Sequence, residues 1–94
     1  MKFGILIHDA NDDVGIAVID LTPNTDIGSA TLEGEDCGSV HVVDNIPLGH
    51  KIALREIPKD KNVIEYGAPI GLAVQTIGKG SHVHIHNLKT LRWS

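Results

Sequence analysis

The apolar residues of this chain are grouped in short runs that Gly, Pro and polar residues separate. No 11-residue window shows a helical period that is free of Gly or Pro. Short apolar runs bounded by turn residues are typical of β-strands. The pattern therefore predicts an all-β fold of short strands and tight turns. The strands are expected over Lys2–His8, Val14–Asp20, Asp26–Glu33, Ser39–Val43, His50–Ile57, Asn62–Tyr66, Pro69–Thr76 and His82–His86.

One turn pattern recurs along the chain. An apolar residue is followed three positions later by a turn residue, and three positions after that by another apolar residue. The turn residues are Asn24, Gly49, Asp60 and Gly80, whose types tolerate left-handed backbone. Each copy predicts the end of one strand, a reversal and the start of the next. The spacing is too irregular for a solenoid and favours a small barrel-like domain. The copies are Leu21–Ile27, which is the loosest, Ile46–Ile52, Ile57–Val63 and Ile77–Val83.

Length and composition limit the size and the chemistry of the core. The chain has 94 residues, which fits one domain over residues 1–94. Phe3, Tyr66 and Trp93 are its only aromatic residues, so the core must consist of Ile, Val, Leu and Ala. A domain of this size buries only about 60–65% of its unfolded surface. Burial against a partner chain, or against a second copy in a homodimer, would add stability.

The charge balance excludes some partners. The 8 Lys and Arg residues against 12 Asp and Glu residues give a formal charge of −4, which argues against nucleic acid. Because the net charge is negative, an anionic substrate would have to be bound by a few Lys or Arg side chains located at the site. No apolar run approaches the roughly 20 residues of a membrane span. The first residues lack the apolar region and cleavage site of a signal peptide, so we expect a cytoplasmic protein.

The segment His82–Asn87 carries the clearest chemical signal. In a strand, His82, His84 and His86 would share one face, and Val83 and Ile85 could face the core. Neighbouring histidines would lie roughly 6.5–7 Å apart and the outer pair roughly 13 Å apart. Two of them, His82 and His84, could therefore share one metal ion, with another chain completing the site. Histidines can also transfer protons near neutral pH. The alternative is an exposed, hydrated row without a ligand.

Three further segments have a functional and a structural interpretation. Asn87 could hydrogen-bond a substrate or simply end the strand in a turn. The corner Gly49-His50-Lys51 could bind a carboxylate through backbone N–H groups and a cation, or could be an ordinary hairpin corner. Gly78–Ser81 lacks the spacing of a phosphate-binding loop, so we interpret it as the turn that leads into the histidine segment.

The remaining polar and Gly-rich stretches are interpreted as structural. Tyr66–Gly71 predicts a rigid kink between two apolar strands. The acidic stretches Asn11–Asp13 and Glu33–Asp36 are expected to be solvated loops, because neither has the alternating frame of a calcium loop.

Three motifs together resemble a known family: residues 44–55, 63–71 and 80–88. They are similar to the small N-terminal domain of the altronate and galactarate dehydratases. In that family the unit also occurs as a separate small subunit, as in (2R)-sulfolactate sulfo-lyase. The resemblance implies the β-clip fold of the SAF group. It also implies an enzyme assembly in which a larger chain carries much of the catalytic machinery, so that this chain would be inactive alone.

The resemblance also implies site residues and a cofactor. His82, His84 and His86 match the family motif as catalytic residues, with His82 and His84 as metal ligands. His50, Lys51 and Asn87 match as substrate-binding residues. The family uses a divalent metal, usually iron. The chain ends where fused members continue, which fits a split subunit with Trp93 as an interface anchor.

The expected function is therefore that of the small subunit of a sugar-acid hydro-lyase. Its histidine row would face an active site shared with the larger chain. Two alternatives stay open: the small subunit of a sulfolactate sulfo-lyase, and a carbohydrate-binding or assembly module without chemistry.

Overall fold

The computed structural model describes residues 3–90, and these residues form strands and turns without a helix. The all-β prediction is confirmed, although most strands are shorter than their apolar runs. Trp93, expected at an interface, lies outside the described residues. The nine strands are β1 (Ile5–Ile7), β2 (Val14–Ala17), β3 (Thr25–Thr31), β4 (Asp36–Val42), β5 (Lys51–Ala53), β6 (Asn62–Glu65), β7 (Ala68–Ala73), β8 (His82–Val83) and β9 (Leu88–Thr90).

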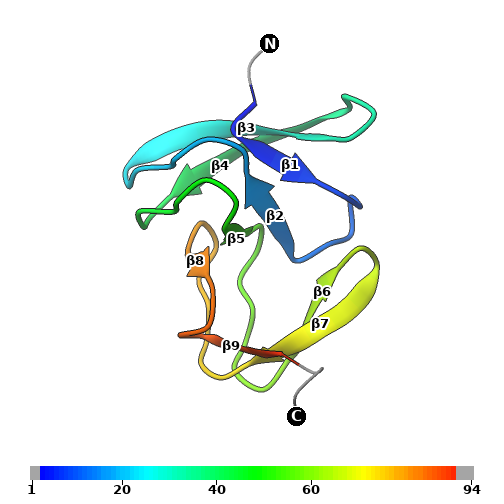
Figure 1. The fold of residues 1–94 in the computed structure, drawn as a ribbon, viewed down its shortest axis with the longest axis vertical. Helices are drawn as coiled ribbons and strands as arrows, with labels where there is room; N and C mark the ends of the chain where they lie inside the picture. The colour runs from blue at the N-terminus through cyan, green and yellow to red at the C-terminus, as the bar shows by residue number, and fades with distance from the viewer. Residues whose placement is uncertain (1–2, 91–94) are drawn as a thin grey trace.

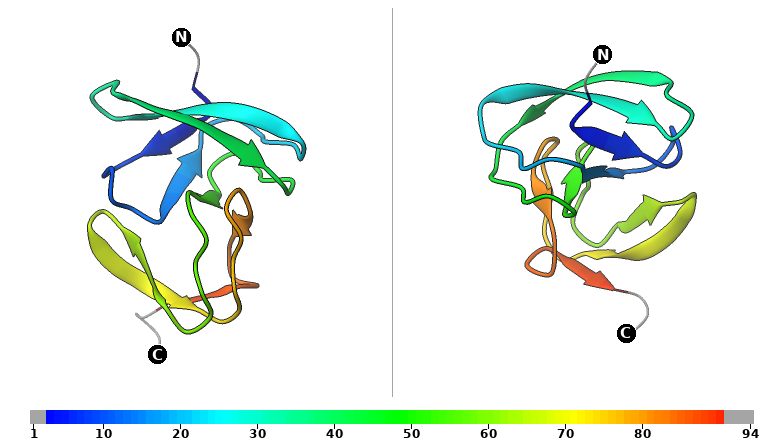
Figure 2. Two further views of the ribbon diagram at one scale, coloured as in Figure 1. Left: turned by 180° about the vertical axis from the view of Figure 1, so that it is seen from behind. Right: turned by 45° about the horizontal axis from the view of Figure 1, so that its top comes forward.

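The strands form two sheets (Figure 1). The larger sheet has the order β4-β3-β1-β2-β5-β8, and the smaller has the order β6-β7-β9. All neighbouring strands are antiparallel except β1 and β3. The two further views in Figure 2 show β8 (orange) beside β5 (green), where it forms the edge of the larger sheet. No helix within residues 3–90 is long and apolar enough to cross a membrane.

Two clusters of buried aliphatic side chains form the core, and the second joins the two sheets. The absence of aromatic residues from both confirms the composition-based expectation. The first cluster consists of Ile5, Ile7, Ala17, Leu21, Val40, Val42, Ile46 and Ile52. The second consists of Val14, Ala53, Ile57, Val63, Ala73, Ile77 and Val83.

The recurring turns take the backbone conformation that their residue types predicted. The φ angles of Asn24, Gly49, Asp60 and Gly80 are 66°, 89°, 70° and 86°. The apolar residues that begin the four copies pair two by two, Leu21 with Ile46 and Ile57 with Ile77, in isolated antiparallel bridges. Local turn chemistry and long-range pairing therefore support each other at each corner.

Gly80 fixes the start of β8 against two other segments. Its N–H donates to the carbonyl of Ala53, and its carbonyl accepts the N–H of Val43. A Cβ atom at this position would lie 2.0 Å from the carbonyl oxygen of His41. Only glycine fits this approach, so the chain enters β8 at a defined place beside β5.

The expectation for Asn11–Asp13 is wrong: Asp12 and Asp13 are buried. The carboxylate of Asp12 accepts the N–H groups of Tyr66 and Gly67, at 2.9 and 3.0 Å. Asp13 accepts the N–H of Ile64 at 2.9 Å. These carboxylates replace water as the partners of backbone N–H groups, which makes their burial tolerable. The kink predicted over Tyr66–Gly71 is confined to Tyr66 and Gly67, which form the β6–β7 turn, because the residues that follow belong to β7. The stretch Glu33–Asp36 is exposed as expected, although Asp36 already begins β4.

Candidate functional site

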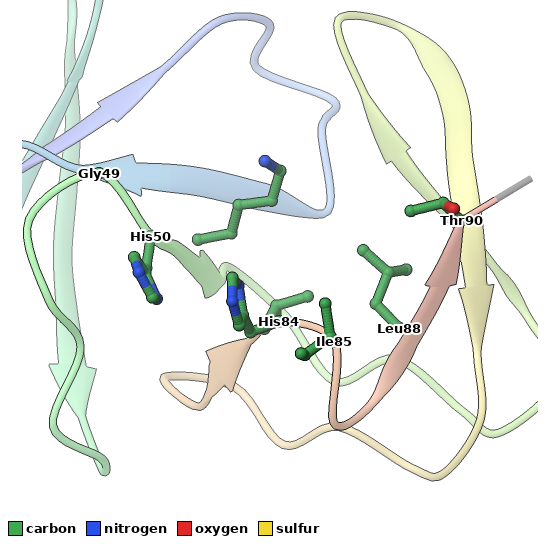
Figure 3. A pocket seen from close by; sticks show the side chains of 8 residues that line it. Gly49, His50, His84, Ile85, Leu88 and Thr90 are labelled. Atoms are coloured by element: carbon green, nitrogen blue, oxygen red, sulfur yellow. The ribbon is translucent and has the colours of Figure 1, made fainter. Parts of the chain in front are cut away.

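Four histidines from two segments gather on one side of the molecule. Nδ1 of His50 lies 2.8 Å from Nε2 of His82. The ring of His84 stacks on that of His50 with centroids 4.4 Å apart, and the rings of His82 and His86 lie 5.3 Å apart. Figure 3 shows His50 and His84 side by side at the edge of a pocket. Histidines predicted for two separate roles therefore form one cluster.

The pairing of β5 with β8 brings these rings together. The two strands are antiparallel, with Lys51 opposite Val83 and Ile52 opposite His82. This register places His50, which precedes β5, beside His84, which follows β8. Because side chains alternate across a strand, His82 and His84 point to the side that His50 also occupies. The sequence analysis identified each of these residues as a candidate. The pairing of β5 with β8 could not be predicted from it, because no local pattern specifies which strands pair.

The expected strand over His82–His86 is wrong beyond Val83. His84–Asn87 form a turn, in which the N–H groups of Asn87 and Leu88 donate to the carbonyl of His84. The turn brings His86 back toward His82, whereas an extended strand would separate them by roughly 13 Å. Val83 is buried as expected, but Ile85 points away from the core and is 83% exposed.

Asn87 is the residue that builds this turn. Its side chain is buried; Oδ1 accepts the N–H of His84 at 3.0 Å, and Nδ2 donates to the carbonyl of His82 at 2.8 Å. The interpretation of Asn87 as a turn residue is confirmed. Its predicted contact with a substrate stays a prediction.

The electrostatics of the cluster favour neutral imidazole at its centre. Burial lowers the pKa of His82, and electrostatic repulsion from the neighbouring His50, His86 and His84 lowers it further. The carboxylate of Asp44, which accepts the backbone N–H of His82 at 2.9 Å, acts in the opposite direction. A neutral imidazole keeps a free lone pair, which is the form that binds a metal ion or accepts a proton.

The donor set fits a divalent metal ion. One nitrogen each from His50, His82 and His84 lies within 4.8 Å of the others. Two nitrogens at about 2.1 Å from one ion lie roughly 2.9–3.4 Å apart, so small side-chain rotations would suffice. The sequence predicted His82 and His84 as the ligands from this chain. The structure adds His50, while His86 lies outside the set.

A pocket of about 230 Å³ adjoins the cluster (Figure 3). Lys51 lines it, and its Nζ lies 3.6 Å from Oε1 of the buried Glu65. Lys51, the cation predicted for substrate binding, therefore lies at the pocket, where its ammonium group is paired with the Glu65 carboxylate. The lining residues are Gly49, His50, Lys51, Val83, His84, Ile85, Leu88 and Thr90.

Comparison with known proteins identifies the family of this chain. The family model of the altronate/galactarate dehydratase SAF domain matches residues 3–91. The chain belongs to this family. The resemblance inferred from three motifs is thereby confirmed, and the match also covers residues 3–43, which precede those motifs.

The relatives of this SAF-domain chain are short subunits and much longer enzymes. It is 38% identical over 94 residues to the (2R)-sulfolactate sulfo-lyase subunit alpha of Chromohalobacter salexigens, covering 99% of this chain and 100% of the relative. It is 42% identical over 86 residues to the altronate dehydratase of Escherichia coli, covering 92% of this chain and 16% of that enzyme. The galactarate dehydratase (L-threo-forming) of Escherichia coli is 37% identical over 81 residues, covering 86% of this chain and 14% of that enzyme. The chain thus spans one whole subunit but only a small part of the dehydratases.

Proposed function

We propose that this protein is the small subunit of a lyase, of the sugar-acid hydro-lyase type, and that it contributes its histidine cluster to an active site shared with a larger chain. The observation that carries the proposal is the convergence of His50, His82 and His84 beside a pocket bordered by Lys51. Membership of a dehydratase family supports it.

The chemistry of such a lyase matches the groups present. The reaction removes a proton from the carbon next to a carboxylate and expels a leaving group from the following carbon. Lys51, at the pocket wall, would bind the substrate carboxylate. His86 lies beside His82 but outside the three-nitrogen set, so it is the histidine best placed to exchange a proton with the substrate or the leaving group.

We further propose that His50, His82 and His84 hold a divalent metal ion, with iron as the expected one. Imidazole nitrogen suits iron and zinc alike, so the donor set by itself does not choose between them. When bound, the ion would stabilise the negative charge that develops on the substrate. Three neutral ligands leave positions for the substrate and for groups of a second chain.

The partner is proposed to be a large lyase chain. Two relatives are named as a subunit alpha, and the dehydratases carry about six times the length of this domain. The site has few catalytic groups besides histidine, and its pocket is bordered by the exposed Ile85. A second chain would complete and cover it.

Sulfolactate is the second candidate substrate, and a specific observation favours it. The sulfo-lyase subunit alpha of Chromohalobacter salexigens is matched along its whole length, whereas the dehydratases are matched over 14–17% of theirs. Both reactions need the same proton removed and differ in the group that leaves, water or sulfite. The small subunit therefore fits either assembly.

Reconstitution tests the proposal. The protein is mixed with a purified large lyase chain from its native cell and assayed with altronate, galactarate and (2R)-sulfolactate, following the keto-acid product and sulfite release. We expect turnover of one substrate only when both chains are present. The His84→Ala variant should lose most of it, and His41→Ala, which alters an exposed histidine on β4, should retain it. A small chain that neither binds nor stimulates the large chain would leave the carbohydrate-binding or assembly module as the better interpretation.

A further inference from the structure

Ile85 is the most exposed large hydrophobic side chain within residues 3–90. It is 83% exposed, and it stands between His84 and His86 at the tip of the turn that follows β8. Single exposed apolar residues are common on protein surfaces. This one, however, borders the pocket beside the histidine cluster.

The turn holds Ile85 in a defined position. The buried Asn87 side chain bridges the backbone of His82 and His84, and two backbone hydrogen bonds to the carbonyl of His84 close the turn. The backbone that carries the projecting side chain therefore loses little conformational freedom on contact with a partner. Such preorganisation favours binding, because less ordering entropy opposes it.

The C-terminal strand lies at the same pocket. Leu88 and Thr90, the first and last residues of β9, line it together with Ile85 (Figure 3). In the dehydratases this domain is the N-terminal part, so the remainder of their chain follows the segment that corresponds to β9. In the dehydratases, the larger part of the chain is thus covalently attached next to the pocket. Where the two parts are separate subunits, the large chain can bind at the same edge of the pocket.

We infer that the surface formed by Ile85, Leu88 and Thr90 is the docking site of the large lyase chain, with Ile85 inserted into an apolar socket of that chain. Docking there closes the pocket over His50 and His84 and removes water from the site. This inference rests on the proposed function, and it names the surface through which that function is assembled. A second copy of this chain is the rival occupant.

The test compares two equally simple truncations in the complete chain. Ile85→Ser removes the proposed anchor, and Leu32→Ser removes a side chain that is 65% exposed in the turn between β3 and β4, at the other end of the molecule (Figure 1). Affinity for the purified large chain is measured by isothermal titration calorimetry. We expect Ile85→Ser to raise the Kd roughly tenfold or more. Leu32→Ser should change it less than about twofold. Both variants should keep the wild-type melting temperature, since neither side chain is buried.

The outcomes separate this inference from the proposed function. If wild type binds and stimulates the large chain but Ile85→Ser binds it equally well, the docking surface is wrong and the function stands. If wild type does not bind the large chain at all, both are overturned. If wild type forms a homodimer that Ile85→Ser alone dissociates, the surface belongs to a second copy and the inference is overturned in favour of that occupant.

Discussion

His50 and His82 are 32 residues apart in the sequence, yet their ring nitrogens Nδ1 and Nε2 lie 2.8 Å apart. Between two neutral imidazoles such a contact requires that one nitrogen carries the proton and the other accepts it. A metal ion bound by both nitrogens would require this proton to move to the other nitrogen of the same ring. The hydrogen bond thus holds two metal-ligand candidates close together. Metal binding is expected to depend on pH, because a protonated imidazole has no free lone pair for the ion.

Removal of His50 should weaken metal binding although the sequence motif of three histidines stays intact. We expect His50→Ala to lower the affinity for Fe²⁺ or Zn²⁺ at least about tenfold, because one of three ligands is lost. Anaerobic calorimetry measures the affinity. His41→Ala is the matched control, since His41 is exposed and paired with Asp26 on the β3–β4 hairpin. Equal affinity in wild type and His50→Ala would remove His50 from the proposed ligand set.

The metal-free protein should lose stability as the pH falls below neutrality. Burial and the neighbouring histidines lower the pKa of His82 from 6.5. Between that lowered pKa and 6.5 the unfolded chain binds more protons than the folded chain, so the free energy of unfolding decreases as the pH falls through this window. Urea titrations in chelator between about pH 5 and 8 measure the slope. His82→Asn should flatten it. If the free energies of unfolding of wild type and His82→Asn differed by the same amount at every pH, His82 would not be the source of the pH dependence.

Asp12 should be essential to the β6–β7 turn. Asp12→Ala leaves the N–H groups of Tyr66 and Gly67 without their carboxylate partner. We expect a loss of about 2–4 kcal/mol in the free energy of unfolding, measured by urea denaturation. Glu33→Ala, at an exposed acidic position, should change it by less than about 0.5 kcal/mol. A similar, small effect in both variants would show that water can replace Asp12.

Gly80 and Gly34 allow the cost of a left-handed backbone to be measured separately from the cost of a steric clash. Gly80 and Gly34 both have φ of 86°, but a Cβ at Gly80 would lie 2.0 Å from the carbonyl oxygen of His41, and none of the surrounding atoms is within 4 Å at Gly34. Gly34→Ala should cost about 1–2 kcal/mol for the left-handed backbone alone. Gly80→Ala should cost about 2–4 kcal/mol and disturb the histidine cluster. Thermal unfolding and the histidine proton spectra check both. Equal losses would refute the close approach.

Lys51 should govern substrate affinity more than turnover. In the reconstituted enzyme, Lys51→Met should raise KM for the anionic substrate about tenfold, with a smaller effect on kcat. It also leaves the buried Glu65 carboxylate without its cation, which destabilises the fold. The double variant Lys51→Met/Glu65→Met should regain stability without regaining affinity. An unchanged KM in either variant would show that Lys51 serves Glu65 and not the substrate.

Much of the fold could be predicted because its determinants are local. Asn24, Gly49, Asp60 and Gly80 were identified as left-handed turn positions from their residue types alone. The aliphatic core followed from the scarcity of aromatic residues. Burial of Asp12 could not be predicted, because its partners lie more than 50 residues away and a carboxylate is expected in water unless distant N–H groups replace it.

The sequence by itself determined the all-β class, the corners, the family and the residue types of the site, since each depends on neighbouring residues or on motif order. Only the tertiary structure decided that His50 joins His82 and His84. That grouping depends on the pairing of β5 with β8 across about 30 residues of chain. The structure also decided that Asn87 folds the histidine row into a turn and exposes Ile85. The alternating pattern there is that of a strand, and the side-chain hydrogen bonds of Asn87 override it.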